Sequence, residues 1–368
     1  MPLLAGGFLE LPLGVLAGDG RRRRLAILGG GILFVLSLLA VATAGSFAVL
    51  LAAFVAFYPA SGAFVSLTQA ELMDAGPDRQ ARHMARWDLA GSAGALAGPL
   101  LLTAVLAGGG GWRAGYLLLA AVSALAWVGA YLRRAPPSPA ADGTADAGEP
   151  ADAGEPADER AWRERARDTV AALRSWGTLR WLLLIEVANL LVDVLTGFLA
   201  LYLVDVVHLS PAVAALAIAI RLGAALAGDA ALIAILERVS DLTVLRVSAG
   251  AAALLYPAFL LVPGVVPKLA ALALLSAATA TWYPLLQARL YGSLPGRSSV
   301  AVTLSSAAGM AGGLGPLAVG LAAQGFGLSW ALAGLAAVPL AVLVLPGRRA
   351  PGRKPPGLGP PGLGPPAA

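Results

Sequence analysis

The sequence predicts an all-α membrane protein made of two similar bundles of transmembrane helices. Three observations carry this prediction. Hydrophobic residues make up 58% of the 368 residues and charged residues only 13%, whereas about a quarter of a soluble domain is charged. Apolar segments of the length that spans a bilayer, about 20 residues, follow one another along nearly the whole chain. Finally, one stretch of sequence occurs twice.

The repeated stretch divides the chain into two halves. Its first copy begins at Gln69-Ala70-Glu71-Leu72 and its second at Gln287-Ala288-Arg289-Leu290, 218 residues later. The same offset relates Pro77 to Pro295, Arg79 to Arg297 and Trp112 to Trp330, and an offset of 217 relates Gly98-Pro99 to Gly315-Pro316. A period this long indicates two large similar units rather than a solenoid of short repeats.

The first bundle, residues 1–134, contains five apolar helices. It opens with an apolar segment, 1–18, which includes Glu10 and is followed by Asp19 and four arginines. Full spans are expected at 25–43, 46–68, 88–106 and 112–132. Residues 71–86, between two of these spans, are predicted to form a polar loop.

A linker, residues 135–177, separates the bundles. It contains the tandem repeat Ala-Asp-Ala-Gly-Glu-Pro, and such an acidic stretch, poor in large apolar residues, is typical of disorder. Residues 160–176 mix tryptophans with arginines, which predicts either an interfacial amphipathic helix or a solvated extension of the next span.

The second bundle, residues 178–346, contains six spans, and the Pro/Gly-rich tail, 347–368, is predicted to be disordered. The six expected spans are 179–204, 211–236, 243–262, 268–288, 299–323 and 328–346.

The basic residues orient the chain in the membrane. With the linker inside, alternation of the spans places all but three of the 26 Lys and Arg residues on that side, the exceptions being Arg113, Arg221 and Lys268. This bias predicts a multi-pass protein of the cell inner (plasma) membrane with a cytoplasmic C-terminus. It also explains the net charge of +5 without nucleic acid as a partner.

Neither enzyme chemistry nor a cofactor is indicated. The chain has no cysteine and two histidines, which argues against thiolate and histidine-rich metal sites. It carries no phosphate-binding Gly-x-x-x-x-Gly-Lys motif, no Gly-x-Ser-x-Gly and no His-Glu-x-x-His. The free energy that the protein uses must therefore come from an ion gradient rather than from ATP.

Two bundles joined by a long cytoplasmic linker resemble the major facilitator superfamily of secondary transporters, and three motifs add to this resemblance. Residues 14–22 are a degenerate match to the family's loop between helices 2 and 3. Gly94-x-x-x-Gly98-Pro99 resembles the helix-5 motif of drug antiporters, although the following glycine pair is replaced by Leu102-Thr103. Gly111-Trp112-Arg113 is similar to the loop that leads into helix 6. The resemblance implies a monomeric transporter of small molecules and protons in the lipid bilayer.

The repeat also predicts that one transmembrane helix is absent. The last five spans of the second half align with the five helices of the first, so the span 179–204 would align with residues before Met1. We therefore expect 11 transmembrane helices instead of the family's 12, with helix 1 absent. Either a start codon placed too late or a truncated paralogue would produce such a chain.

Ionisable residues inside spans mark candidate coupling and substrate positions, because they are costly in lipid and usually face the interior or a water path. Glu186, Asn189 and Asp193 share one face of a helix. Asp193 lies about 18 Å and Arg221 about 15 Å from the outer ends of their helices, which predicts an ion pair that either couples transport or merely joins two helices. Glu186 and Asp229 lie deeper, where two carboxyls hold a proton between them more readily than one alone. Glu10 aligns near Asp229 in the repeat.

Two further sets complete the candidate site. Trp282 and Tyr283, with Tyr58, either line a cavity for an apolar or aromatic substrate or pack against the core and lipid. Charged residues near the helix ends predict a network that closes a cytoplasmic gate, with a solvated, positively charged loop as the alternative. The gate residues are Asp19, Arg21, Arg22, Glu71, Arg86 and Arg289, joined by Asp74, Asp78, Arg79, Arg82, Asp88 and Arg297.

The sequence thus predicts a secondary active transporter, and the partial helix-5 motif favours proton-coupled efflux of a small amphipathic or drug-like solute. The rival interpretation is a membrane protein that does not transport: a sensor, an assembly partner or an inert truncated paralogue. The nucleotides upstream of Met1 discriminate between them, since an apolar span encoded there in frame would favour the transporter.

Overall fold

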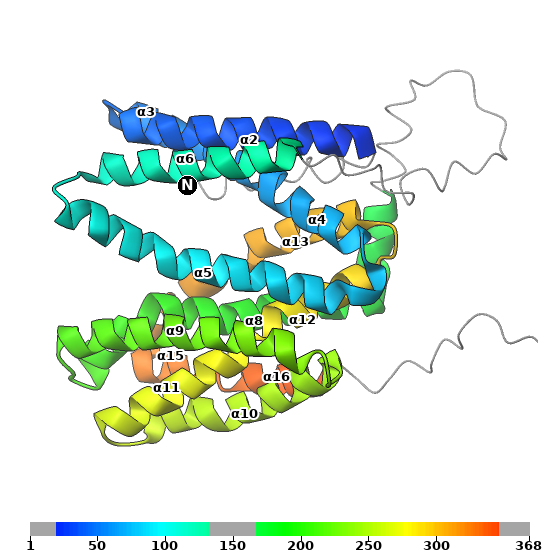
Figure 1. Ribbon diagram of the computed structural model, residues 1–368. Helices are drawn as coiled ribbons and strands as arrows, with labels where there is room; N and C mark the ends of the chain where they lie inside the picture. Colours follow the sequence, from blue (N-terminus) through cyan, green and yellow to red (C-terminus); the bar gives the residue numbers. More distant parts are fainter. Residues whose placement is uncertain (1–19, 133–166, 346–368) are drawn as a thin grey trace, which may run out of the picture.

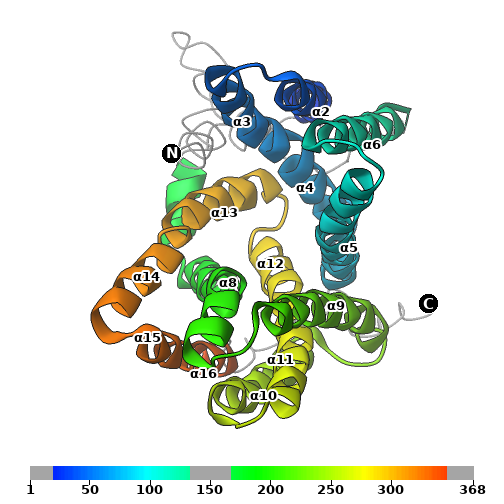
Figure 2. The ribbon, with the colours of Figure 1, turned by 90° about the vertical axis from the view of Figure 1, so that its left-hand side faces the viewer.

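The computed structural model describes residues 20–132 and 167–345, and nearly all of these residues are helical (Figure 1). Two groups of helices lie side by side, one from each half of the sequence, and Figure 2 shows them end-on. The α-helical membrane fold predicted from the hydropathy pattern is confirmed.

The first half consists of five α-helices joined by short turns. A π-helical turn, η1 (Gly62–Ser66), connects α3 to α4, and a short 3₁₀ turn, η2 (Pro77–Arg79), precedes α5. The α-helices are α2 (Gly20–Thr43), α3 (Phe47–Ser61), α4 (Leu67–Asp74), α5 (Gln80–Ala107) and α6 (Trp112–Leu132).

The second half contains more helices because several of its spans are broken. A π-helical turn, η4 (Tyr202–Val206), ends the first span. The α-helices are α8 (Trp176–Leu201), α9 (Pro211–Ile235), α10 (Asp241–Leu261), α11 (Val265–Ala280), α12 (Trp282–Ser293), α13 (Ser298–Gly312), α14 (Gly315–Phe326), α15 (Leu328–Gly334) and α16 (Ala337–Val344).

Within the described residues, nine helical segments are long and apolar enough to cross a membrane, and a tenth, Leu328–Val344, is shorter. These ten match ten of the expected spans. The remaining apolar segment, 1–18, lies outside the described residues, as do most of the linker and the tail.

Serine side chains fix where several spans begin. Ser46, Ser210 and Ser240 each precede a helix and accept a hydrogen bond from the backbone N–H three residues later. This contact satisfies one of the N–H groups that the first helical turn leaves without a partner. Short polar turns therefore separate the spans although the flanking sequence is apolar.

The structure corrects two expected boundaries. Residues 71–86 are not a loop: α4 continues to Asp74 and α5 begins at Gln80. Residues 80–87 contain no glycine or proline, so α5 extends beyond the apolar segment as an amphiphilic helix. The expected span 299–323 is also interrupted, because α13 ends at Gly312 and α14 starts at Gly315, directly before Pro316.

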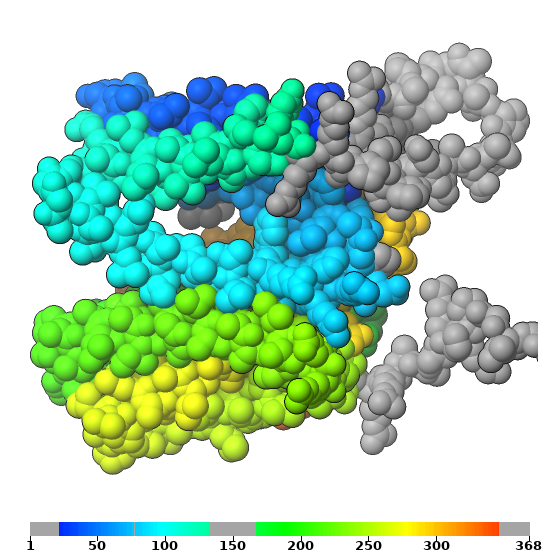
Figure 3. Space-filling view, viewed as in Figure 1, coloured from blue at the N-terminus to red at the C-terminus, as the bar shows by residue number. Residues whose placement is uncertain are grey.

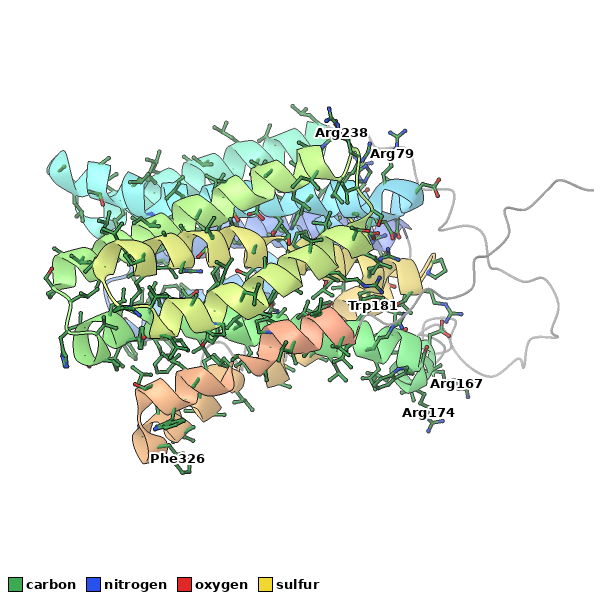
Figure 4. The ribbon with its side chains drawn as sticks, turned by 90° about the horizontal axis from the view of Figure 1, so that it is seen from below. Arg79, Arg167, Arg174, Trp181, Arg238 and Phe326 are labelled. Carbon is green, nitrogen blue, oxygen red and sulfur yellow. The ribbon has the colours of Figure 1, made fainter. Side chains whose placement is uncertain are left out.

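The halves contact each other mainly through α5, which packs on α9 and α12, and through α4, which packs on α13. Arg79, Arg167, Arg174 and Arg238 all lie at one end of the molecule, whereas Phe326 lies at the other (Figure 4). We call the first the arginine-rich end. The surface is hollowed between α5 and α6 (Figure 3).

Candidate functional site

A cavity of about 470 Å³ lies between the two halves. The first half contributes α3, η1 and α4 to its wall, and the second contributes α12, α13 and the turn that follows. Its lining residues are uncharged and rich in hydroxyl and amide groups: Tyr58, Ser66, Gln69, Tyr283, Gln287, Tyr291, Val302, Ser305, Ser306, Gly309, Met310, Gly313 and Leu314.

The repeat contributes one glutamine from each half to this wall. Gln69 and Gln287 open the two copies, and both side chains are almost fully buried, with 6% and 2% of their surface exposed. The Gln69 amide donates a hydrogen bond to Met84 Sδ at 3.1 Å, and the Gln287 amide donates to Ser305 Oγ at 3.2 Å. The repeat was visible in the sequence, but neither glutamine was predicted as a site residue.

The Gln287 side of the cavity has unused hydrogen-bonding capacity. The Tyr291 hydroxyl faces the Gln287 carboxamide. Yet neither this hydroxyl nor Gln287 Oε1 makes a hydrogen bond of ordinary geometry to any described residue. Buried polar atoms are rarely left without partners, so this wall is suited to a ligand that brings both a donor and an acceptor.

Of the predicted aromatic pair, only Tyr283 lines the cavity. Its hydroxyl lies within hydrogen-bonding reach of Gln69, across the boundary between the halves. Trp282 is 1% exposed and donates its indole N–H to Ser248 Oγ at 3.1 Å, which joins α12 to α10. Tyr58, also named from the sequence, lies in the wall on the opposite side.

Glu186 lies beside the cavity on α8. Its carboxylate fits against Gly312 so closely that a Cβ at that glycine would overlap Glu186 Oε2. It interacts electrostatically with Asp193 and Tyr283, not with Asp229 as the sequence predicted. Asn189 lies between Glu186 and Asp193 on α8 and is partly buried.

The predicted Asp193–Arg221 ion pair is not formed. Arg221 is 9% exposed and donates from Nη2 to Thr196 Oγ1 at 2.8 Å. Asp193 is exposed and lies near enough to interact electrostatically, but the two groups are not within the 4.0 Å of an ion pair. Matching depths placed the two residues at the same level without fixing the direction of their side chains.

Asp229 pairs instead with the first half. Its carboxylate accepts a hydrogen bond from Ser92 Oγ at 2.5 Å, and the Asp88 carboxyl lies within hydrogen-bonding reach. Ser92 and Asp88 are one turn apart on α5, and Asp229 is on α9. Asp88 was predicted as a gate residue, and Ser92 was not predicted as a site residue.

At the arginine-rich end, two of the predicted gate residues, Asp74 and Arg82, make contacts between the halves, and Arg23 and Ser298, which were not predicted, join them. Arg23 donates to Asp74 Oδ2 and to Ser298 Oγ, both at 2.8 Å, and Ser298 donates to Asp74 in turn. Arg82 donates to the Leu236 carbonyl at 3.4 Å. Both contacts cross from the first half to the second.

Most of the predicted gate residues take no part in these contacts. Arg289 pairs with Asp241 of its own half at 2.5 Å. Glu71 and Arg86 are exposed, and no hydrogen bond or ion pair connects their side chains to another described residue. Arg22 is exposed at the start of α2, and Arg21 lies in the same helix. Glu10 and Asp19 lie outside the described ranges.

This fold and cavity belong to a known class of protein. The family model of the Major Facilitator Superfamily matches residues 1–302, and the chain belongs to this family. It is therefore a transporter rather than an enzyme. Among curated proteins, no sequence matches the chain.

Solved transporters share the fold. The fucose:proton symporter FucP of E. coli superposes with a TM-score of 0.73 at 15% identity over 93% of this chain and 88% of its own. The proton:xylose symporter XylE gives 0.67 at 14%, over 92% and 83%. The human organic anion transporter MFSD10 gives 0.66 at 22%, over 93% and 83%. At these identities the likeness concerns the fold alone.

Proposed function

We propose that this member of the family carries a small uncharged organic solute through the cavity between its halves, coupled to a proton. The observation behind the proposal is the wall itself, in which both halves present tyrosines, glutamines and serines and no charged side chain. Hydroxyl and carboxamide groups bind the hydroxyls of a polar solute, and the tyrosine rings cover its apolar faces. An amphipathic solute satisfies both.

The size of the cavity supports a compound of ordinary metabolite or drug dimensions. Sites for such ligands measure about 300–1,000 Å³, and 470 Å³ falls within this range. The cavity lies at the boundary between the repeated halves, where rocking of one half against the other would expose it alternately to the two sides.

Proton coupling is proposed from the acidic residues near the cavity. Glu186 touches the Gly312 backbone next to the wall, and Asp88 and Glu186 both act electrostatically on Tyr283. Acidic residues within spans are typical of proton pathways. The Asp193–Arg221 region is a secondary candidate, because its charges interact without forming a pair.

The direction of transport remains a prediction. The partial helix-5 motif favours efflux, whereas the names of FucP and XylE describe proton symport. We retain efflux as the prediction from the sequence. The direction of solute transport is measured separately from its coupling to protons. A location in the inner membrane with a cytoplasmic C-terminus belongs to the same proposal.

The test uses purified protein in liposomes that contain a pH-sensitive dye. Uncharged sugars, sugar alcohols and aromatic glycosides are added one at a time, and solute-dependent proton movement is recorded; its sign gives the direction. Gln287→Leu should shift the response to solute concentrations about tenfold to a hundredfold higher, while Gln324→Leu, at an exposed glutamine of α14 outside the wall, should preserve it. If no solute class moves protons, or if both variants behave alike, the proposal fails and the rival, a protein that does not transport, is favoured.

A further inference from the structure

Two carboxyl groups from opposite halves meet inside the molecule. Asp88 enters from α5 of the first half and Asp229 from α9 of the second, and their side chains lie within hydrogen-bonding reach. Ser92, one turn after Asp88, donates its hydroxyl to Asp229 Oδ2. Asp229 is 1% exposed. This contact therefore joins the halves in a place from which water is largely excluded.

One oxygen of this cluster has no donor. Asp229 Oδ1 is buried and receives no hydrogen bond from any residue that the structure describes. Two ionised carboxylates are both acceptors and cannot bond to each other. A carboxyl that keeps its proton is a donor, so a single proton on either acid joins the two groups and satisfies Asp229 Oδ1.

The charged side chains near the pair are directed elsewhere, so a proton is left to form the hydrogen bond between the two carboxyls. On α12, Tyr283 interacts electrostatically with Asp88, and Glu186 of α8 acts on the same tyrosine. On α5 itself, Arg82 is directed to the Leu236 carbonyl, and on α9 Arg221 is directed to Thr196. Among the described ion pairs, none brings a Lys or Arg to Asp88 or Asp229. Within residues 20–132 and 167–345, the two carboxyls therefore have no positively charged partner.

We propose that Asp88 and Asp229 bind one proton between them and that this shared proton latches the two halves together at the arginine-rich end. With the proton, the pair is a hydrogen bond; without it, the pair is two like charges in a poorly solvated place, which repel strongly. Loss of the proton therefore weakens closure at this end. The inference deepens the proposed function, on which it rests for its role in transport, but its test does not require transport.

The other contacts across this end do not share this dependence. The Arg23–Asp74–Ser298 contact pairs a permanent positive charge with a carboxylate, and Arg82 donates to a carbonyl. The carboxyl pair is thus the element of closure that responds to protons.

The experiment measures the separation of the halves directly. Because the chain has no cysteine, Asp78→Cys and Glu237→Cys introduce two labelling sites without further changes. Both residues are exposed, and they flank the Arg82–Leu236 contact from opposite halves. Spin labels at these sites report the distance distribution of purified protein at about pH 5 and about pH 9, the range in which a shared proton is bound or lost.

We expect the short distance to dominate in acid and to lose most of its population in alkali. Asp88→Asn places a permanent amide donor opposite Asp229 and should hold the short distance at both pH values, as should Asp229→Asn from the other side. Glu71→Gln, at an exposed carboxylate of α4, is the control and should respond to pH like the unsubstituted labelled protein.

Three results would overturn the latch: a distance that ignores pH in the labelled protein, a response that survives both asparagine variants, or a distance that follows sodium concentration at constant pH. The last would assign the carboxyls and Ser92 to a metal cation. Proton flux in liposomes is recorded on the same samples. Proton flux without a distance change would contradict the latch and support the transporter. A distance change without proton flux would support the latch and contradict the proposed transport.

Discussion

The two copies of the repeated stretch both place a glutamine at the cavity, but they carry different residues at the arginine-rich end. Gln69 and Gln287 open the two copies and line the same wall from opposite sides. Two positions further on, Glu71 is exposed and makes no described contact, whereas its counterpart Arg289 pairs with Asp241. The glutamine that faces the cavity is thus the same in the two halves, while the residue two positions later differs.

The difference follows from what each position contacts. Gln69 and Gln287 occupy equivalent positions of the repeat at the cavity, and a glutamine fits both although its partner is Met84 in one half and Ser305 in the other. The closure of the arginine-rich end needs complementary partners, as when Arg23 and Asp74 of the first half meet Ser298 of the second. Complementarity requires the halves to differ.

The largest effect is expected from the two glutamines. Gln287→Leu removes an unpartnered acceptor and should raise KM for the transported solute about tenfold to a hundredfold, since a lost hydrogen bond at a buried polar site costs about 1–3 kcal/mol. Gln69→Leu should have a smaller effect because its amide is already bound to Met84 and its side chain faces Tyr283. Solute-dependent proton flux measures both variants. An equal loss in the two would mean that the cavity uses the glutamines symmetrically.

The gate comparison concerns two acids on one helix, α4. Asp74→Asn should destabilise the protein by about 2 kcal/mol, because Arg23 loses its carboxylate in a setting where the side chains are 14% and 17% exposed. Glu71→Gln should change the stability by less than about 0.5 kcal/mol, as is usual for surface positions. Thermal unfolding in detergent checks the pair. Similar shifts for both acids would restore Glu71 to the gate.

Glycine positions 218 residues apart provide the third comparison. A Cβ at Gly94 meets open space, whereas a Cβ at Gly312 would overlap Glu186. Gly312→Ala should therefore cost about 1–2 kcal/mol through overpacking and displace a proposed coupling carboxyl, while Gly94→Ala is tolerated. Unfolding measurements and proton flux together check this difference. A functional, stable Gly312→Ala protein would show that Glu186 has room to move.

The smallest effect is expected at Arg289. Its bond to Asp241 stays within one half, and the two side chains are 35% and 23% exposed, so solvent screens the pair. Arg289→Gln should cost no more than about 0.5–1 kcal/mol and leave the spin-label distances unchanged. A change in those distances would contradict the assignment of Arg289 to the scaffold of its own half.

The sequence was sufficient for the membrane fold and for most span boundaries, because hydropathy and bilayer thickness fix both. It was not sufficient for the partners of the buried charges. Counting residues along a helix gives depth, and depth alone grouped Glu186 with Asp229 and Asp193 with Arg221. The helices face other neighbours: Asp229 meets Asp88 and Ser92, and Arg221 meets Thr196. The rotation of each helix is set by packing, and a single sequence does not contain it.

The cavity residues could not be predicted for a different reason. The repeat marked Gln69 and Gln287 as equivalent, and pseudo-symmetry would have suggested that both face the axis between the halves. The predicted site residues were mainly ionisable groups instead, because these groups are costly in lipid. An uncharged wall has no such signal, and its glutamines are distinguishable from structural ones only when their burial and missing partners are seen.

The interruption between α13 and α14 affects how the wall responds to substitution. Pro316 has no N–H, so the carbonyl of Gly312 lacks the donor that a continuous helix would supply, and Gly309 and Gly313 next to it belong to the wall. The main chain thus offers an acceptor that exchanging side chains leaves in place. Substitution of the wall glutamines and serines changes side chains only, so the break between α13 and α14 beside the wall should persist in such variants.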